Sequence, residues 1–369
     1  MTKNFINHLK KLDWILIISA LLLVFIGLLS LYSSSLGRDS FLNFQKQIIF
    51  FGIGLFLMFL VSFFDYRIIK NSPYLILIFY SLCCLALVGL FFFAPEIRGS
   101  RGWYRLGGIS LDPIEFTKIA LIILLAKYFS MRHIEMYGLR HILISSVYFL
   151  IPAALIFFQP DLGSILILLC LWVGILIISS IKLKHFLILI FCGILIFTIS
   201  WSFLLKDYQK ARILSFIQPQ IEPLGVGWSQ NQSRIAIGSG GFLGQGIGQG
   251  SQTQYGFLPE PQTDFIFASI AEEMGLMGVV ILSALFLIVL FRIFKIAIVS
   301  SSNFQRLFAS GLGIILMAQI FINIGMNLGL LPIIGISLPF ISYGGNNLVL
   351  TFLALGILQN IYSQKQKGD

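Results

Sequence analysis

Runs of about 20 mostly apolar residues recur along the chain and restrict it to one class of fold. Ten such runs are present, at 13–34, 46–64, 73–94, 113–131, 142–158, 163–181, 186–205, 265–291, 307–331 and 339–362. About 20 apolar residues are enough for an α-helix to cross the hydrocarbon core of a bilayer. A transmembrane β-barrel would instead show shorter segments of alternating polarity, and the sequence has none. The sequence therefore predicts an all-α polytopic integral membrane protein with about ten transmembrane helices.

The composition supports this class and indicates a single domain. Hydrophobic residues make up 57% of the chain and charged residues 11%, whereas a soluble domain has about 25% charged residues. The only long polar interval, about 206–264, falls between the seventh and eighth runs. A connection of that length without a domain of its own is usually functional or disordered. We therefore expect one membrane domain over 1–369, with one large loop.

The distribution of charge between the loops predicts the orientation of the chain. With an even number of spans, both termini face the same side of the membrane. The tails and loops on that side contain fifteen Lys and Arg residues but four Asp and Glu residues, and an excess of Lys and Arg marks cytoplasmic loops. Both termini are therefore predicted in the cytoplasm and the 206–264 loop outside. Because topology accounts for the net charge of +10, the basic balance predicts no nucleic-acid partner.

The residue types available on the outer side limit the chemistry that can occur there. The four cysteines lie within apolar runs and lack the spacing of a metal site or a disulfide framework. The four histidines lie on or near the predicted cytoplasmic side. Any chemistry in the outer loops therefore depends on Asp, Glu, Lys, Arg and hydroxyl groups.

The outer loop at 95–112 places Arg101 and Arg105 among glycines and aromatic residues. Arginine side chains suit phosphate oxygens, and glycines let the backbone approach a ligand closely. The alternative is an aromatic anchor at the membrane interface, with arginines that extend to the polar layer. Local sequence leaves both readings open.

The start of the fourth span combines a helix cap with an intramembrane charge. Asp112 is placed as an N-cap and Pro113 as the first helical residue, with Glu115 as the capping-box partner. Lys118 follows on the same helical face as Glu115, and an intramembrane Lys is costly unless it is paired or faces a wet cavity. A Glu115–Lys118 pair satisfies it. The pair is either structural or part of a substrate groove.

Further carboxylates lie where later spans begin. Asp161 is placed to cap the sixth span, and Asp264 either caps the eighth span or acts in chemistry, with Glu260 close before it. Glu272 and Glu273 lie about two turns deeper, where they must face protein or a cavity rather than lipid.

The long loop contains a glycine-rich run with interleaved apolar residues, from Gly225 to Gly250, and carries Arg212 and Arg234. Successive backbone N–H groups of such a run can form an anion-binding nest, although a flexible hinge has the same composition. The apolar residues predict short amphipathic helices that fold back over the bundle. In the ninth span, Asn323 and Asn327 are one turn apart and are expected to hydrogen-bond between helices.

Several motifs together resemble the SEDS family (shape, elongation, division and sporulation). They follow one another in family order over about 100–345. They are Arg-Gly-Trp-Tyr-Arg-Leu-Gly-Gly at 101–108, Pro-Ile-Glu-Phe-Thr-Lys at 113–118, Gln-Pro-Asp-Leu-Gly at 159–163, Arg-Ile-Ala-Ile-Gly-Ser-Gly-Gly at 234–241, Gly-Ser-Gln-Thr-Gln at 250–254, Leu-Pro-Glu at 258–260, Thr-Asp-Phe-Ile-Phe-Ala at 263–268, Ala-Glu-Glu-Met-Gly-Leu at 271–276 and Pro-Phe-Ile-Ser-Tyr-Gly-Gly at 339–345. The chain departs from the family pattern at Asn346 and Asn347, where small residues are usual.

This resemblance implies a peptidoglycan glycosyltransferase that polymerises lipid II into β-1,4 glycan strands during cell elongation. It places the chain in the bacterial inner membrane, with the reaction at the outer leaflet. Asp264 is the general base that the motif match implies. The other residues expected in the substrate site are the candidate pyrophosphate clamps Arg101, Arg105, Arg212 and Arg234, and the groove residues Glu115, Lys118, Asp161, Glu260, Ser342 and Tyr343.

The resemblance also implies partners. They are a class B penicillin-binding protein, which crosslinks the strands, and other proteins of cell-wall elongation. No ligand cluster in the sequence requires a cofactor. A divalent cation, Mg²⁺ or Mn²⁺, near Asp264 and the pyrophosphate is compatible with the sequence, since carboxylates and substrate phosphates commonly hold Mg²⁺ together. Two other functions fit ten helices with intramembrane charges: a flippase or transporter of lipid II, and a non-catalytic scaffold of the elongation complex.

Overall fold

The structure is a computed structural model that describes residues 8–95, 102–106, 109–131, 139–179, 181–205, 209–211, 214, 216 and 226–365. Each of the ten predicted apolar runs overlaps a helix, and the bounds differ by up to eight residues. These helices are α2 (Trp14–Leu36), α3 (Leu42–Phe63), α5 (Pro73–Phe93), α6 (Pro113–Ser130), α7 (Leu139–Phe158), α8 (Leu162–Ile178), α9 (Leu183–Ile199), α13 (Ile266–Val299), α14 (Asn303–Leu328) and α15 (Gly345–Lys365). Shorter elements join them: α4 (Arg67–Asn71), the π-helix η1 (Ser200–Leu204), α11 (Val226–Ser239), α12 (Ser251–Gln254) and the strands β1 (Tyr104–Leu106) and β2 (Ile109–Leu111).

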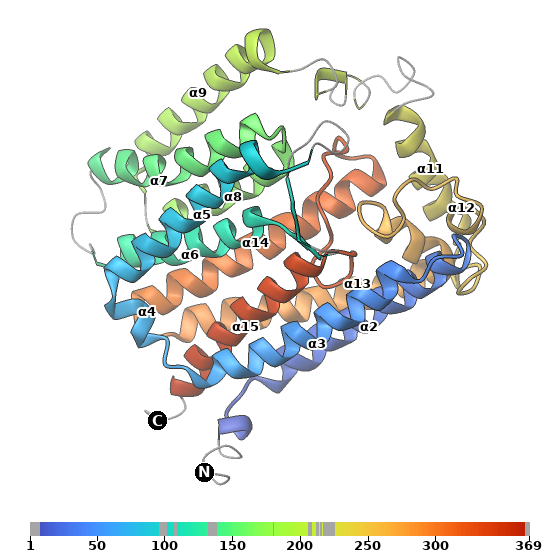
Figure 1. Ribbon diagram of the computed structural model, residues 1–369, viewed down its shortest axis with the longest axis horizontal. Helices are drawn as coiled ribbons and strands as arrows, with labels where there is room; N and C mark the ends of the chain where they lie inside the picture. The colour runs from blue at the N-terminus through green and yellow to red at the C-terminus, as the bar shows by residue number, and fades with distance from the viewer. Residues whose placement is uncertain are drawn as a thin grey trace.

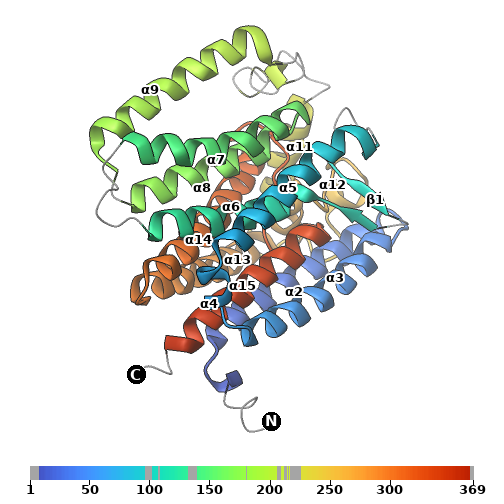
Figure 2. The ribbon, with the colours of Figure 1, turned by 60° about the vertical axis from the view of Figure 1, so that its left-hand side comes forward.

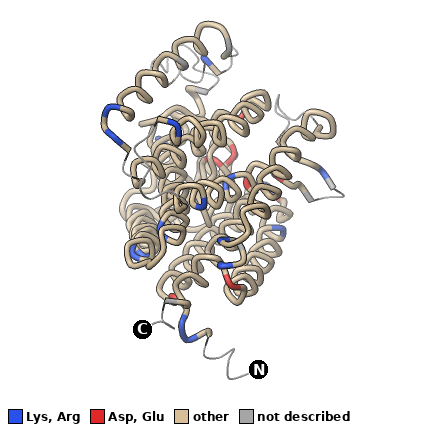
Figure 3. The backbone as a smooth tube through the Cα atoms, turned by 90° about the vertical axis from the view of Figure 1, so that its left-hand side faces the viewer, with Lys and Arg blue, Asp and Glu red and all other residues tan. Residues whose placement is uncertain are grey.

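The helices have the length and polarity of a multi-pass membrane protein. Over the described residues, seven are long and apolar enough to cross a membrane: α2, α3, α5, α7, α9 with η1, α13 and α14. The apolar α8 is shorter, and α6 carries Glu115, Lys118 and Lys127. Charged residues are sparse along the tube, most of which is tan in Figure 3.

The bundle is built around α14, which has 72% of its apolar window buried. α13 packs against α2 and α14, α6 packs between α5 and α14, and α15 lies along α3 (Figures 1 and 2). The two ends of the described chain meet, because the Asp13 N–H donates to Gln359 Oε1 over 2.8 Å. α9, in contrast, stands apart from the other helices and has no buried share of its apolar window (Figure 1).

A buried ion pair joins three helices where α2 begins. The Arg292 guanidinium on α13 contacts both carboxylate oxygens of Asp13, with Nε 2.8 Å from Oδ2. Asp13 is also the N-cap of α2, where its side chain accepts from the Leu16 N–H. Together with the bond to Gln359 on α15, this pair holds α2, α13 and α15 together.

The glycine-rich loop is bound to a kink in α13 at Gly275, where the backbone has φ 64° and ψ −165°. A kink leaves helical N–H and C=O groups without their usual partners. Here the N–H groups of Gln245 and Gly246 donate to the carbonyls of Glu272 and Glu273. On the other side of the kink, the N–H groups of Leu276 and Met277 donate to the loop carbonyls at 241 and 242. The described part of the loop is therefore fastened to α13 through its backbone.

The buried acids of α13 extend this attachment. Glu272 is fully buried, and its carboxylate accepts from the N–H groups of Gln252 and Thr253 in α12. Glu273 accepts from the Ser33 hydroxyl of α2 and from Gln254 Nε2. Both acids face protein, as the sequence predicts.

Two helices of the large loop, α11 and α12, pack on the bundle. α11 packs on α13 and α14, and α12 contacts α2 and α13. The prediction of short helices that fold back over the bundle agrees with this arrangement. The hairpin of β1 and β2 was not predicted: it pairs Tyr104 with Leu111 in antiparallel register within an interval expected to be loop.

Candidate active site

A pocket of about 330 Å³ lies where several helices begin. Its walls come from the hairpin, from the starts of α6, α8 and α15, from the chain before α13, from α3 and α14, and from the loop before α15. The lining residues are Phe50, Trp103, Ser110, Asp112, Glu115, Lys118, Asp161, Ser164, Ile167, Thr263, Asp264, Gln319, Gly335, Ile336, Ser337, Tyr343, Gly344, Gly345, Asn346 and Asn347. Five of the predicted site residues are therefore brought together here: Glu115, Lys118, Asp161, Asp264 and Tyr343.

The start of α6 supplies the ion pair expected from the sequence. Lys118 Nζ lies 2.7 Å from Glu115 Oε1, and the two side chains are 7% and 15% exposed. Asp112 caps α6 by accepting from the Ile114 N–H. Glu115 bonds to Lys118, so the predicted role of Glu115 as a capping-box partner is replaced by the ion pair. The pair is structural and also lines the pocket.

Asp161 combines a capping role with a position on the pocket wall. Its carboxylate accepts from the Ser164 N–H over 3.0 Å and from the Ser164 hydroxyl over 2.6 Å, at the start of α8. The prediction that Asp161 caps this helix is confirmed. Because Ser164 also lines the pocket, the cap itself forms part of the wall.

Asp264 lies just before α13 rather than at its cap position. The helix begins at Ile266, and its N-cap is Phe265, whose side chain makes no capping bond. The Asp264 side chain is half-buried on the pocket wall. A Cβ placed on Gly335 would lie 3.6 Å from Asp264 Oδ2, so the loop before α15 passes close to this carboxylate.

The segment that carries Asp264 is held by three consecutive carbonyls. The Gln262 carbonyl accepts from the Tyr343 N–H over 2.8 Å, and the Thr263 carbonyl accepts from the Ser342 hydroxyl over 2.7 Å. The Asp264 carbonyl accepts from two side-chain amides of α14. Ser342, predicted in the substrate site, thus fastens this segment, and it also accepts from the Leu338 N–H.

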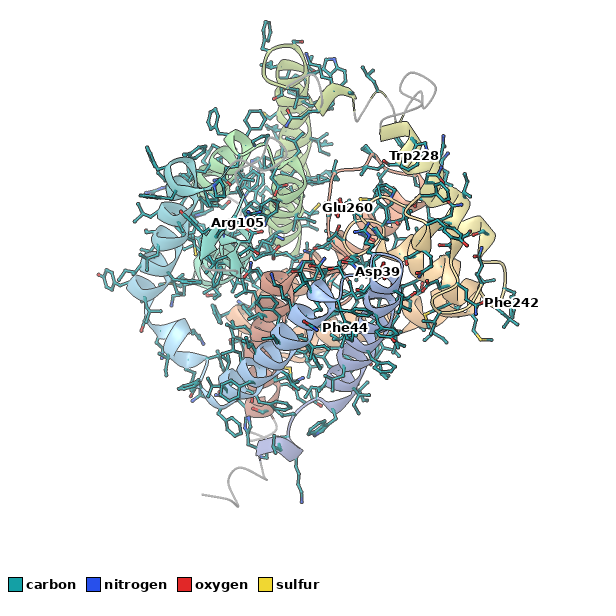
Figure 4. The ribbon with its side chains drawn as sticks, turned by 45° about the vertical axis from the view of Figure 1, so that its right-hand side comes forward. Asp39, Phe44, Arg105, Trp228, Phe242 and Glu260 are labelled. Carbon is teal, nitrogen blue, oxygen red and sulfur yellow. The ribbon has the colours of Figure 1, made fainter. Side chains whose placement is uncertain are left out.

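Other predicted site residues lie elsewhere. Arg105 is exposed on β1, and Figure 4 shows it and Glu260 on separate elements. Glu260 is half-buried in the turn before Asp264, with φ 43°. Arg234 on α11 donates to the carbonyls of Leu328 and Gly329 at the end of α14. None of these three lines the pocket, and Arg101 and Arg212 lie outside the described residues.

The described pocket wall carries more negative than positive side chains. Asp112, Glu115, Asp161 and Asp264 face one cation, Lys118. Burial, and next the Glu115 carboxylate, raises the pKa of Asp112 well above its ordinary value. Among the described residues, no three Asp, Glu, His or Cys side chains are grouped closely enough to hold a metal ion. The described wall therefore does not form a cation site by itself.

The backbone offsets part of this negative charge. Four helices begin at the pocket, since α6 starts after Asp112, α8 after Asp161, α13 after Phe265 and α15 at Gly345. The N-terminus of an α-helix carries the equivalent of roughly half a positive charge and favours anionic groups. These helix N-termini therefore supply positive potential beside charged side chains that are mostly acidic.

Sequence reasoning did not select several of the lining residues: Trp103, Gln319, Ser337, Asn346 and Asn347. Asn346 Nδ2 donates to the Ser110 carbonyl, which joins α15 to the hairpin, and Asn347 Nδ2 donates to Ser337 Oγ. Two signals were available: the departure from the family pattern at 346 and 347, and the motif at 101–108, which contains Trp103. The remaining residues reach the pocket only through the fold.

The bundle and its pocket define the class: a multi-pass α-helical membrane protein with a charged pocket among helix N-termini. Within that class, the chain belongs to the family described as cell cycle protein, which comprises FtsW, RodA and SpoVE. The family model matches residues 13–367. The resemblance seen in the motifs is confirmed.

Individual relatives match almost the whole chain. Peptidoglycan glycosyltransferase MrdB of Escherichia coli K12 is 34% identical, over 98% of each chain. Stage V sporulation protein E of Bacillus subtilis is 36% identical, over 95% of this chain and 96% of its own.

Solved structures share the fold. A chain from a peptidoglycan synthase complex gives a TM-score of 0.82 at 29% identity, over 97% of this chain and 99% of its own. The rod shape determining protein RodA of Thermus thermophilus gives 0.70 at 26% identity, over 95% of this chain and 96% of its own.

Proposed function

We propose that this protein is a peptidoglycan glycosyltransferase that polymerises lipid II into β-1,4 glycan strands during cell elongation. The observation that carries the proposal is the position of Asp264. This residue lines a pocket that the Glu115–Lys118 pair also lines, on a segment fastened by three consecutive carbonyls. The relative from Escherichia coli that matches over nearly the full length is itself named a peptidoglycan glycosyltransferase.

In the proposed reaction, Asp264 acts as the general base. It takes the proton from the sugar hydroxyl of the acceptor, and the hydroxyl oxygen then bonds to the anomeric carbon of the donor sugar. The bond from that carbon to the pyrophosphate oxygen breaks, and undecaprenyl pyrophosphate leaves with the electron pair. One displacement inverts an α-linked donor into a β-linked product. A positioned base of this kind contributes about 10²- to 10⁴-fold to the rate.

Charge stabilisation of the leaving group comes from the pocket wall. Lys118 and the four helix N-termini supply positive potential near the developing negative charge. The arginines 101, 105, 212 and 234 remain proposed pyrophosphate contacts. A divalent cation would be held by Asp264 together with the substrate phosphates, and it would stabilise negative charge on the leaving pyrophosphate.

The proposed function also implies a membrane location, an orientation and partners for the chain. The pocket opens to the outer leaflet of the bacterial inner membrane, both termini lie in the cytoplasm, and the chain acts with a class B penicillin-binding protein and other elongation proteins. The excess of Lys and Arg on the side of the termini supports the orientation. The relative in the peptidoglycan synthase complex, whose structure concerns coordination of polymerization and crosslinking, supports the partner.

The test is a polymerisation assay with purified protein and lipid II, with and without the partner and with Mg²⁺ or Mn²⁺ supplied or chelated. The wild type should form glycan strands, and Asp264→Asn should lower the rate by at least 100-fold. Normal polymerisation by Asp264→Asn would remove Asp264 from the mechanism. Movement of lipid II across liposome membranes without any polymer would favour the flippase. Absence of both activities would favour the scaffold.

A further inference from the structure

Two buried asparagines on α14 hold the main chain of Asp264. Asn323 Nδ2 donates to the Asp264 carbonyl over 3.1 Å and to the Ile336 carbonyl over 2.7 Å. Asn327 Nδ2 donates to the same Asp264 carbonyl over 2.9 Å. Both asparagines are 0% exposed. The carbonyl of Asp264 thus has two rigidly placed donors, and Asn323 also ties it to the loop that passes its carboxylate.

Asn327 also performs the capping role that the sequence made available to Asp264. Its Oδ1 accepts from the Ala268 N–H over 3.2 Å. Ala268 is the third residue of α13, and the N–H groups of a first turn have no partner within their own helix. Such an N–H is usually satisfied by the side chain of an N-cap residue such as Asp. Here the acceptor comes from another helix.

We propose that Asn327, assisted by Asn323, is a positioning residue for Asp264. It fixes the main chain of Asp264 through the carbonyl, and it supplies the cap acceptor for the present start of α13 through the Ala268 N–H. Without Asn327, α13 can start one residue earlier, with Asp264 as its N-cap and its carboxylate turned to the backbone. The catalytic part of this inference rests on the proposed role of Asp264.

A purely structural role predicts a different outcome, and α15 offers a matched residue for comparison. Asn360 is 3% exposed, donates to the Ser62 carbonyl over 2.7 Å and accepts from the Tyr66 N–H over 3.1 Å. It therefore makes the same two kinds of backbone bond as Asn327. It lies in the last turns of α15, whereas the pocket adjoins the first.

The experiment compares Asn327→Leu, Asn323→Leu and Asn360→Leu in the full-length protein with lipid II as substrate. Asn327→Leu should lower kcat by about 10- to 100-fold, as expected when a reacting group is displaced by about 1 Å. It should also move the acid limb of the kcat/KM profile to lower pH by about one unit, because a backbone N–H bond favours the ionised carboxylate. Asn323→Leu should lower kcat and leave the acid limb in place, since the Ala268 bond remains.

The control separates this effect from loss of stability. Asn360→Leu should lower the unfolding temperature and leave kcat and the pH profile unchanged. Among the described residues, the other titratable groups that line the pocket with Asp264 are the same in every variant: Asp112 before α6, Glu115 and Lys118 on α6, Asp161 before α8, and Tyr343 before α15.

Hydrogen–deuterium exchange supplies a readout that does not depend on activity. Exchange over 262–268 should be faster in Asn327→Leu than in Asn360→Leu. This difference is expected whether or not the wild type makes polymer. Absence of polymer would refute only the proposed function. If Asn327→Leu does not fold, Asn327→Asp keeps the acceptor for Ala268 and loses the donor, and it should fold with reduced kcat. The inference is overturned if the variant that folds has wild-type kcat, or if exchange over 262–268 is unchanged.

Discussion

The carboxylate of Glu115 and the ammonium group of Lys118 meet at 2.7 Å on the wall of the pocket, where both side chains are largely withdrawn from solvent. Removing one member of such a pair leaves the other charge buried without its partner, which costs more than removing both. Lys118→Met should therefore destabilise the protein by about 2–3 kcal/mol, measured as thermal unfolding in detergent. The double variant Glu115→Gln/Lys118→Met should recover part of this loss. Equal stability of the single and double variants would contradict the ion pair.

The close approach of Gly335 to Asp264 Oδ2 gives a second prediction. Gly335 has φ 75°, and an added Cβ would lie 3.6 Å from that oxygen. Gly335→Ala should therefore reduce polymerisation as well as stability, because the methyl group enters the pocket and the backbone is strained by about 1 kcal/mol. Gly256→Ala is the control: Gly256 also has φ 75° but has open space around its Cβ position. It should share the loss of stability and keep full activity per folded molecule.

The buried ion pair of Asp13 and Arg292 predicts a stability effect that salt does not remove. Arg292→Met leaves the Asp13 carboxylate, in a residue that is 2% exposed, without its cation, and should cost about 3–5 kcal/mol. The unfolding temperature should fall by a similar amount at low and high ionic strength, because buried pairs are weakly screened. Adding Asp13→Asn should recover part of the loss, since Asn still caps α2. A loss that disappears in salt would show an exposed pair instead.

Asp112 predicts a pH dependence of stability with a defined sign. Burial and the Glu115 carboxylate raise the pKa of Asp112 in the folded protein, so the folded state binds the proton more tightly than the unfolded state. This contribution is fully present below the unfolded pKa and is lost as pH rises through the folded pKa. In Asp112→Asn, which keeps the N-cap, the free energy of unfolding should fall less steeply as pH rises above about 4. Identical pH profiles for variant and wild type would show that Asp112 has an ordinary pKa.

The helical architecture could be predicted from the sequence because it depends on local properties. Apolar length alone located the ten helices, and capping chemistry located the starts of α6 and α8 at Asp112 and Asp161. The Glu115–Lys118 pair followed from helical spacing within one element. Each of these inferences needed only residues within a few positions of one another.

The candidate site could be predicted only in part, because its remaining contacts join distant segments. Arg234 was expected at a phosphate, and the structure places it on the carbonyls that end α14, a partner 94 positions along the chain. Ser342 was expected at the substrate, and it holds the Thr263 carbonyl. Asn346 reaches the hairpin at Ser110. No spacing rule within one segment predicts such pairings.

The convergence of four helix starts on the pocket has a consequence for how the site responds to change. Side-chain charges titrate, and each can be removed by one substitution. The dipoles of the peptide groups do not titrate, and one substitution does not remove them, because every residue of a helix contributes to the helix dipole whatever its side chain. A substitution scan across the pocket will therefore leave this share of the electric field intact in each variant, and the field will persist at any pH at which the bundle is folded.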